Sequence, residues 1–347
     1  MVTGEITQSG VNLKAKSDNS SMSENTHHLL IPFAAVSSEA AAKHIQGLKL
    51  PNLRELLAQL TLVDSDIGTE DSFSTPHERA TAKAQGLPVV DGSIPWAAQE
   101  AAKLGLKDAV SAPWGWVSLC SNFVGTGSLT LEDPALLQVT EIESRQLFND
   151  MQPYFAEDGL TLHVVCPNQW LVSGEPLRNV RTASLDRVIG KDLSDWQPDR
   201  GESAKLRRLQ NEMQMLLYTH TVNDVRSRNN SSPINSIWLH GVGELSELGE
   251  KVSTNIQPSV SIPRSLTDAA MREDWPAWVK AWEQLDATLC ADLLKLAQAG
   301  EPVTLTLCGE RSALTYDLRP KSAFERLKGN FRGIFGLQPA YLLPRQL

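Results

Sequence analysis

The sequence lacks paired cysteines, long apolar runs and basic clusters, and each absence excludes a class of protein. Its four cysteines, Cys120, Cys166, Cys290 and Cys308, are far apart and form no CxxC motif, so they indicate neither a zinc knuckle nor a redox pair. No run approaches the roughly 20 apolar residues of a membrane-spanning helix. No basic run of five or more residues offsets the net charge of -9, which argues against general nucleic-acid binding.

The remaining composition is that of an ordinary soluble globular protein. Of the 347 residues 41% are hydrophobic and 21% are charged. The first 26 residues are rich in Ser, Asn, Thr and Gly and contain no apolar segment of the kind found in secretory signals. We therefore expect a disordered tail over residues 1–27, a single domain over residues 28–347, a cytoplasmic location and reduced thiols.

Alternating strand and helix patterns predict an α/β fold with a mainly parallel central sheet flanked by helices. The acidic run 63–70 has turn character, and residues 303–308 and 313–318 form a C-terminal hairpin. Helices are expected over 51–60, 96–104, 141–151, 203–218 and 274–299, and strands over 29–36, 113–119, 160–166, 170–172, 234–239 and 258–262. The tryptophans of the last helix are expected to pack in the core.

Residues 203–243 contain a group of candidates for ligand binding. An amphipathic helix runs into His220, Asn223 and Arg226, and a buried strand then carries Asn235 and ends at His240. Ligand sites of open α/β sheets lie where strands deliver their carboxyl ends, so these side chains are candidates for ligand binding. Alternatively, His220 and Asn223 cap the carboxyl end of the helix and Asn235 satisfies a turn.

Two further segments carry residues of the types that recognise anions. His77 and Arg79 follow Thr75, which with Glu78 predicts a capping box at a helix start. Arg181, Ser184 and Arg187 lie in a polar segment, where an arginine pair can clamp a carboxylate or phosphate. The same arginines can instead form salt bridges with Asp186 and Asp192 on a surface loop.

Several segments of the chain together resemble a proteobacterial group of RpfE-type regulatory proteins, also described as cofactor-independent phosphoglycerate mutases. These segments are HLLIPFA, LPNLRELL, STPHERA, RTASLDRVIG and PINSIWLHGVG. The resemblance covers nearly the whole chain from His28. It implies a phosphoglycerate mutase or regulatory function.

The segment from His220 to Gly243 is also similar, more distantly, to archaeal-type phosphoglycerate mutases. In these enzymes an Asn and an Arg precede a Pro-x-Asn strand that ends in a Gly-x-Gly turn. This resemblance implies an alkaline-phosphatase-like fold and assigns these positions to Asn223, Arg226, Asn235, Gly241 and Gly243.

The sequence departs from that superfamily at the metal ligands. Its enzymes hold two divalent cations with Asp and His at strand ends. Here the first strand ends in Pro32-Phe33-Ala34 where an Asp-Gly pair is expected, and the late strand ends in Cys308-Gly309-Glu310 where Asp-His is expected. No two histidines have metal-ligand spacing on one helix. We therefore expect neither a metal nor another cofactor.

Three functions follow from these observations. The first is a regulatory protein that lacks the two-metal site and binds a phosphorylated or carboxylated small molecule. The second is an active mutase or phosphatase with unrecognised metal ligands, for which Asp64, Asp66, Asp91 and Asp186 are available. The third gives the central stretch a structural role only. No nucleic-acid or membrane partner is expected, and the oligomeric state is not indicated. The predicted ligand-binding residues are Arg181, Ser184, Arg187, His220, Asn223, Arg226, Asn235, His240, His77 and Arg79.

Overall fold

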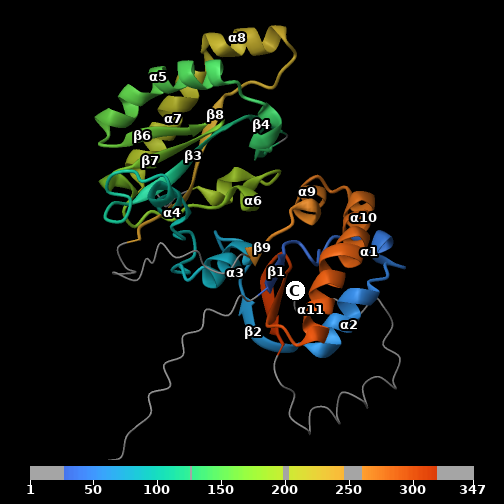
Figure 1. Ribbon diagram of the computed structural model, residues 1–347. Helices are drawn as coiled ribbons and strands as arrows, with labels where there is room; N and C mark the ends of the chain where they lie inside the picture. Colours follow the sequence, from blue (N-terminus) through green and yellow to red (C-terminus); the bar gives the residue numbers. More distant parts are fainter. Residues whose placement is uncertain (1–26, 126, 198–202, 246–259, 319–347) are drawn as a thin grey trace, which may run out of the picture.

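The computed structural model describes residues 27–125, 127–197, 203–245 and 260–318. These residues form two larger β-sheets, each packed against its own helices (Figure 1), and a third sheet of two strands. The predicted α/β class is therefore confirmed. Nearly all of the predicted tail lies outside the described residues, and the single domain stays a prediction.

The five-stranded sheet has the strand order β2-β11-β10-β1-β9. Its strands are β1 (His27–Ile31), β2 (Thr61–Ile67), β9 (Val260–Ser261), β10 (Val303–Cys308) and β11 (Ser312–Asp317). β1 pairs in parallel with β10 and β9, whereas β11 pairs antiparallel with both β10 and β2. The C-terminal hairpin is confirmed, but the sheet is mixed rather than mainly parallel.

Residues 63–67 of the acidic run that was expected to be a turn belong to the edge strand β2. Its charged side chains are tolerated there because basic residues of α3 (Pro76–Ala84) pair with them: Lys83 contacts Asp64 and Arg79 contacts Asp66, both at 2.7 Å. An edge strand can carry charges that a central strand could not bury without partners.

Helices cover both faces of the five-stranded sheet. On one face pack α1 (Glu39–Ile45), α2 (Pro51–Gln59), α10 (Trp275–Leu285) and α11 (Ala291–Ala299), and α3 packs across the other face (Figure 1). Trp278 and Trp282 are fully buried, and their indole nitrogens donate to Phe33 O at 3.0 Å and Ala34 O at 3.2 Å. The prediction that these tryptophans pack in the core is confirmed.

The helix predicted over 274–299 is interrupted by a five-residue π-helical segment, Asp286–Cys290. Asp286 is buried, and its carboxylate accepts hydrogen bonds from Leu53 N at 2.7 Å and Asn52 N at 3.3 Å. These amides belong to the first turn of α2, where backbone N–H groups have no partner within the helix. The π segment therefore holds α2 against α10 and α11.

The second sheet is antiparallel, with strand order β6-β7-β3-β8. Its strands are β3 (Trp114–Cys120), β6 (Thr161–Cys166), β7 (Gln169–Ser173) and β8 (Ser236–Gly243). One face packs against α5 (Glu141–Glu157) and α7 (Ala204–Tyr218), and the other packs against α4 (Trp96–Lys103). Because β8 lies in this antiparallel sheet, its end is not the parallel-sheet edge that the sequence interpretation assumed. The described chain also forms a small hairpin of β4 (Asn122–Val124) and β5 (Leu129–Leu131).

Two helix boundaries differ from the sequence predictions. α5 continues through Pro153 to Glu157, six residues beyond its predicted end at Met151. The polar residues into which α7 was expected to run form a separate helix, α8 (Thr221–Arg228). His220 lies at the N-cap of this helix, and its Nδ1 accepts a hydrogen bond from Val222 N at 3.2 Å.

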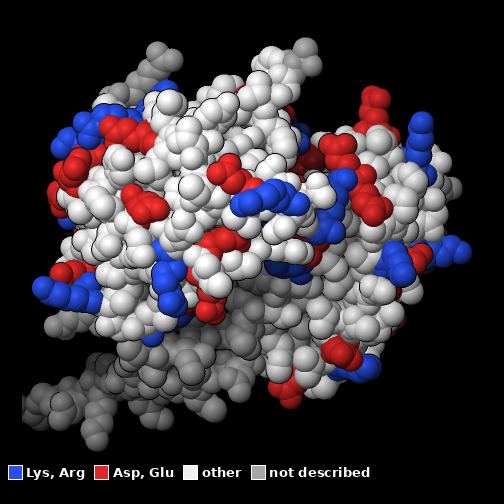
Figure 2. All heavy atoms as spheres, turned by 90° about the horizontal axis from the view of Figure 1, so that it is seen from above, with Lys and Arg blue, Asp and Glu red and all other residues white. Residues whose placement is uncertain are grey.

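The molecular surface mixes charges of both signs. Figure 2 shows acidic and basic side chains interspersed over one face, and neither sign forms a large continuous patch there. Among the described residues, we find no helix with the length and apolar character that crossing a bilayer requires.

Candidate functional site

A cavity of about 620 Å³ lies at the carboxyl ends of the parallel strands β1 and β10. The two strand ends are joined where Ala34 N donates to Cys308 O at 2.7 Å. The opposite wall comes from α6 (Leu185–Val188) and the short helix η3 (Leu193–Trp196), and Figure 1 shows α6 between the two sheets. This is the edge at which α/β proteins bind ligands.

The two sides of this cavity differ in chemistry. The residues after β1 and around the start of α10 supply an apolar side: Phe33, Val36, Ala270, Met271 and Trp275. The α6–η3 segment supplies a charged side: Asp186, Arg187, Lys191, Asp192 and Asp195. The first turn of α3 and the β10–β11 turn complete the lining with Thr75, Pro76, His77, Gly309, Glu310 and Arg311.

The first turn of α3 is fixed by the predicted capping box. Glu78 accepts hydrogen bonds from Thr75 N at 2.9 Å and Thr75 Oγ1 at 3.0 Å, and Pro76 occupies the first helical position. Burial raises the pKa of the Glu78 carboxyl, although the charge of His77 works in the opposite direction. The cap places His77 against the cavity.

His77 is buried, and its two ring nitrogens have different surroundings. Nε2 lies 3.0 Å from Asp186 Oδ2 and 3.2 Å from Thr75 Oγ1. Nδ1 is buried and has no hydrogen-bond partner within the described part of the chain. The ring also lies against Phe33, with 5.7 Å between the ring centroids.

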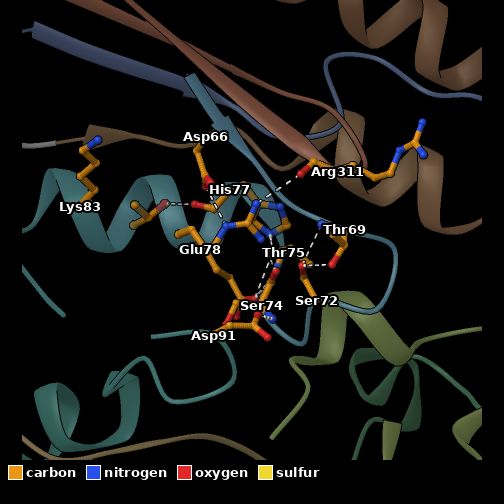
Figure 3. Close-up of polar contacts among 12 residues, drawn as sticks. Asp66, Thr69, Ser72, Ser74, Thr75, His77, Glu78, Lys83, Asp91 and Arg311 are labelled. Carbon is orange, nitrogen blue, oxygen red and sulfur yellow. Dashed lines mark hydrogen bonds and ion pairs between the residues drawn. The ribbon is translucent and has the colours of Figure 1, made fainter. Parts of the chain in front are cut away.

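Arg79 is buried and has its donors occupied by the protein. Its Nε donates to Asp66 at 2.7 Å, and its terminal nitrogens donate to Ser74 O at 2.7 Å and Arg311 O at 3.2 Å. Figure 3 shows Asp66, Ser74 and Arg311 converging on the start of α3. The predicted anion contact of Arg79 is thus replaced by bonds that join α3 to β2 and to the β10–β11 turn.

Arg187 is a half-buried cation of the cavity and has few partners among the described residues. Its only hydrogen bond to a described residue is a long one, 3.4 Å from a terminal nitrogen to Ser74 O, and its Nε is buried without a partner. The guanidinium carbon lies 5.5 Å from the centroid of the Trp196 ring. Burial lowers the pKa of Arg187, and the carboxyl groups of Glu78 and Asp91 offset part of that effect.

Asp186 holds the walls of the cavity together. It accepts hydrogen bonds from His77 at 3.0 Å and from Arg264 at 3.3 Å, and Arg264 is the N-cap residue of α9 (Ser265–Met271). Burial alone would raise the pKa of the Asp186 carboxyl, but the hydrogen bond and charge of His77, together with Arg264, lower it strongly. Asp186 is therefore a carboxylate at neutral pH.

Two cavity residues have left-handed backbone conformations although neither is glycine. Phe33 has φ 50° and Glu273 has φ 53°. A bulky side chain is rare in this region, and such residues cluster at functional sites because the surrounding structure must enforce them. Phe33 is held by the bond from Trp278 to its carbonyl.

Three other predicted ligand-binding residues, Arg181, Ser184 and His240, do not line this cavity. Arg181 contacts Asp91, lies 4.8 Å from the Phe73 ring centroid and lines a separate cavity of about 360 Å³. Ser184 is the N-cap residue of α6, and its amide donates to Phe73 O at 3.2 Å. His240 lies on β8 with Nε2 2.9 Å from Ser118 Oγ, and burial lowers its pKa to about 4 despite the charge of Asp186.

Asn223, Asn235 and His220 bind the backbone or a single carboxylate. Asn223 donates to Leu217 O and Ile234 O and accepts from Ile234 N, each at 2.8 Å. Asn235 exchanges two hydrogen bonds with the backbone of Asn122, and His220 lies 3.0 Å from Asp150 beside an open groove of about 910 Å³. The structural interpretation is confirmed for Asn223, which binds Leu217 O near the carboxyl end of α7, whereas His220 caps the start of α8 and Asn235 joins β8 to the distant Asn122.

Arg226 is 3% exposed and is hydrogen-bonded to three groups of the protein itself. It donates to Leu137 O at 2.6 Å, Ser232 O at 2.7 Å and Glu143 at 3.0 Å. Figure 1 shows α8 far from α3 and α6. The structure therefore does not bring Arg226 together with Arg187.

The carboxylates considered as metal ligands are each paired with a basic side chain. Asp64 contacts Lys83, Asp66 contacts Arg79, Asp91 contacts Arg181, and Asp186 contacts His77 and Arg264. Across the described ranges no three or more His, Cys, Asp or Glu side chains are grouped so that they could hold a metal ion. The described residues do not fit the two-metal site that the family resemblance implies.

Sequence reasoning missed most of the cavity lining. Phe33 and Glu310 were noted only as substitutes for metal ligands, and Lys191, Trp196 and Trp275 carried no functional signal. The parallel pairing of β1 with β10 places positions 33 and 310 at one edge, and no sequence pattern indicated that pairing.

No protein-family model and no curated protein matches the sequence. Among solved structures, the cofactor-independent phosphoglycerate mutase from Thermoplasma acidophilum has a TM-score of 0.34 and 13% identity, over 84% of this chain and 89% of that chain. The PH0037 protein from Pyrococcus horikoshii has a TM-score of 0.35 and 12% identity, over 85% and 87%. Both are distant structural neighbours, and similarity at this level carries no conclusion about function.

Proposed function

We propose that this protein binds a small phosphorylated or carboxylated molecule at Arg187 in the cavity beside β1 and β10, and that this binding serves a regulatory role. The observation that carries the proposal is the state of Arg187. A guanidinium has five N–H donors, and this one makes a single long hydrogen bond to the described residues while lining a cavity.

A half-buried cation with unused donors is unfavourable unless an anion or water completes its hydrogen bonds. A carboxylate or phosphate can accept two parallel bonds from one guanidinium, which is the strongest pairing available to arginine. Lys191 lines the same cavity and adds a second positive charge. An anionic ligand therefore supplies what Arg187 lacks.

The acidic residues of the cavity do not remove this preference, because several are already paired. Asp186 is bonded to His77 and Arg264, Glu310 accepts a hydrogen bond from Ser37, and Glu70 pairs with Arg311. Asp192 accepts a hydrogen bond from Ser194 N at 3.0 Å. Arg187 keeps its uncommitted donors beside these satisfied carboxylates.

The evolutionary part of the proposal rests on the sequence resemblance. We propose a divergent relative of the phosphoglycerate mutases, with an alkaline-phosphatase-like origin, a single domain from residue 28 onward and a cytoplasmic location. Loss of the metal ligands at positions 33 and 310 would convert a catalytic site at the ends of β1 and β10 into a site that only binds its ligand. This origin favours a phosphorylated ligand over a carboxylated one.

Isothermal titration calorimetry tests the binding. Inorganic phosphate, 3-phosphoglycerate and citrate are titrated into the wild type, Arg187→Gln and Arg208→Gln. Arg208 is the matched control, because it is an exposed arginine that pairs with Asp158 away from the cavity. We expect at least one anion to bind the wild type and Arg208→Gln alike, and Arg187→Gln to weaken that binding by roughly tenfold or more. Absence of binding to the wild type, or equal affinity in all three proteins, contradicts the proposal.

A further inference from the structure

The size and the two-sided lining of the cavity narrow the class of ligand. Ligand pockets for molecules of drug size span roughly 300–1,000 Å³. The cavity of about 620 Å³ lies in that range and leaves most of its volume unfilled around a three-carbon phosphoester. A ligand that fills it has a second group besides the anion.

The side of the cavity opposite Arg187 is suited to a flat apolar group. Phe33 packs against the core cluster that contains Trp275, and Val36 and Met271 extend the same wall. Phe33 has a left-handed backbone conformation, and the bond from Trp278 to its carbonyl holds it there. Aromatic side chains of this kind pack against nucleobases, whose faces are apolar.

Unpaired carboxylates lie at the rim between these two sides. Asp195 and Glu273 line the cavity, are exposed and form no ion pair with a described residue. Carboxylate oxygens accept hydrogen bonds from hydroxyl and amino groups. They are suited to the hydroxyl groups of a sugar or to the exocyclic amine of a base, and they disfavour a ligand that is anionic throughout.

We infer that the ligand is a nucleoside monophosphate, with its phosphate at Arg187 and Lys191 and its base against Phe33 and Trp275. Because this rests on the proposed anion binding at Arg187, the test must separate the two. A ligand with one anionic end and one flat apolar end matches the distribution of charge and aromatic surface in the cavity, and a ribose joins the two ends beside the rim carboxylates.

The experiment is a calorimetric comparison of AMP, GMP, ribose 5-phosphate and 3-phosphoglycerate on the full chain. We expect AMP or GMP to bind at least tenfold more tightly than ribose 5-phosphate. Phe33→Leu should weaken nucleotide binding by roughly fivefold or more while the affinity for ribose 5-phosphate changes less than twofold. Phe123→Leu, at a half-exposed phenylalanine on β4, is the matched control and should bind like the wild type.

Two results would overturn the inference in distinguishable ways. Equal affinity for all four phosphates, with loss of binding in Arg187→Gln, contradicts the nucleotide inference but agrees with the proposed function. Absence of binding by every phosphate contradicts the nucleotide inference, and absence of binding by citrate as well contradicts the proposed function. If Phe33→Leu fails to fold, the ratio of AMP to ribose 5-phosphate affinity in the wild type alone still decides between nucleotide and simple phosphoester.

Discussion

His77 and Asp186 are separated by 109 positions in the sequence, and their side chains meet at 3.0 Å across the candidate site. His77 belongs to the first turn of α3, which covers the five-stranded sheet, whereas Asp186 belongs to α6 beneath the antiparallel sheet. Asp186 also accepts a hydrogen bond from Arg264, at the start of α9. A single carboxylate therefore joins three elements that surround the cavity.

We expect Asp186→Asn to destabilise the protein by about 1–3 kcal/mol at pH 7, because two charge-assisted hydrogen bonds lose their negative acceptor. Urea unfolding of both proteins measures the difference. Asp150→Asn is the matched control, since Asp150 also lies 3.0 Å from a histidine but is half-exposed, so its loss should change the unfolding free energy by less than about 1 kcal/mol.

The effect of Asp186→Asn should depend on pH. The folded-state pKa of Asp186 is lowered, so its contribution is complete above the ordinary carboxyl pKa near 3.8 and is lost as the pH falls below that value. The unfolding free energies of wild type and variant should converge in that acidic range. A difference that stays constant from pH 7 to pH 3 would contradict this assignment.

His240→Gln should remove a pH dependence that the wild type shows. Burial lowers the folded-state pKa of His240 from 6.5 to about 4, so the folded protein holds the neutral ring. The wild type should lose up to about 3 kcal/mol of stability as the pH falls from 6.5 toward 4, because the unfolded chain binds the proton first. Denaturant unfolding at pH 7, 5.5 and 4.5 measures this loss. The control His44→Gln, on exposed α1, should follow the wild type, and parallel curves for all three proteins would refute the prediction.

Arg226→Ala should affect stability rather than binding. The variant leaves Glu143 and two backbone carbonyls without their partner, and breaking a buried ion pair costs about 3–5 kcal/mol. Thermal or urea unfolding gives the loss, and calorimetry under conditions where the variant is folded gives its anion affinity. A large loss of anion affinity with unchanged stability would instead indicate that Arg226 belongs to the binding site.

Chelation should leave anion binding unchanged, because the counter-charge in our proposal is the Arg187 side chain. The measurement is calorimetry before and after dialysis against EDTA, with elemental analysis of the purified protein. Stoichiometric manganese or zinc, together with loss of binding on chelation, would favour the alternative of an active mutase or phosphatase.

Local sequence patterns predicted the elements that depend on local physics. The apolar period of residues 203–218 gave α7, the Thr75 and Glu78 pair gave the α3 cap, and alternation over 303–318 gave the hairpin. Strand β2 was missed because its two aspartates resemble a turn until the basic side chains of α3 pair with them.

The candidate site was harder to predict because it depends on contacts between distant residues. Arg187 was predicted to bind a ligand and lines the cavity, but it was grouped with Asn223 and Arg226, which the chain uses to bind its own backbone. The pairing of residues 27–31 with 303–307 creates the edge at which the cavity lies, and no local pattern encodes that register.

The most direct test is a crystal structure of the protein soaked in tungstate, an anion whose tungsten atom is located by anomalous scattering. We predict a tungsten peak in the cavity within hydrogen-bonding distance of the Arg187 guanidinium, and its displacement when AMP is added. A cavity without tungsten, in crystals that bind it elsewhere, would contradict anion binding at Arg187.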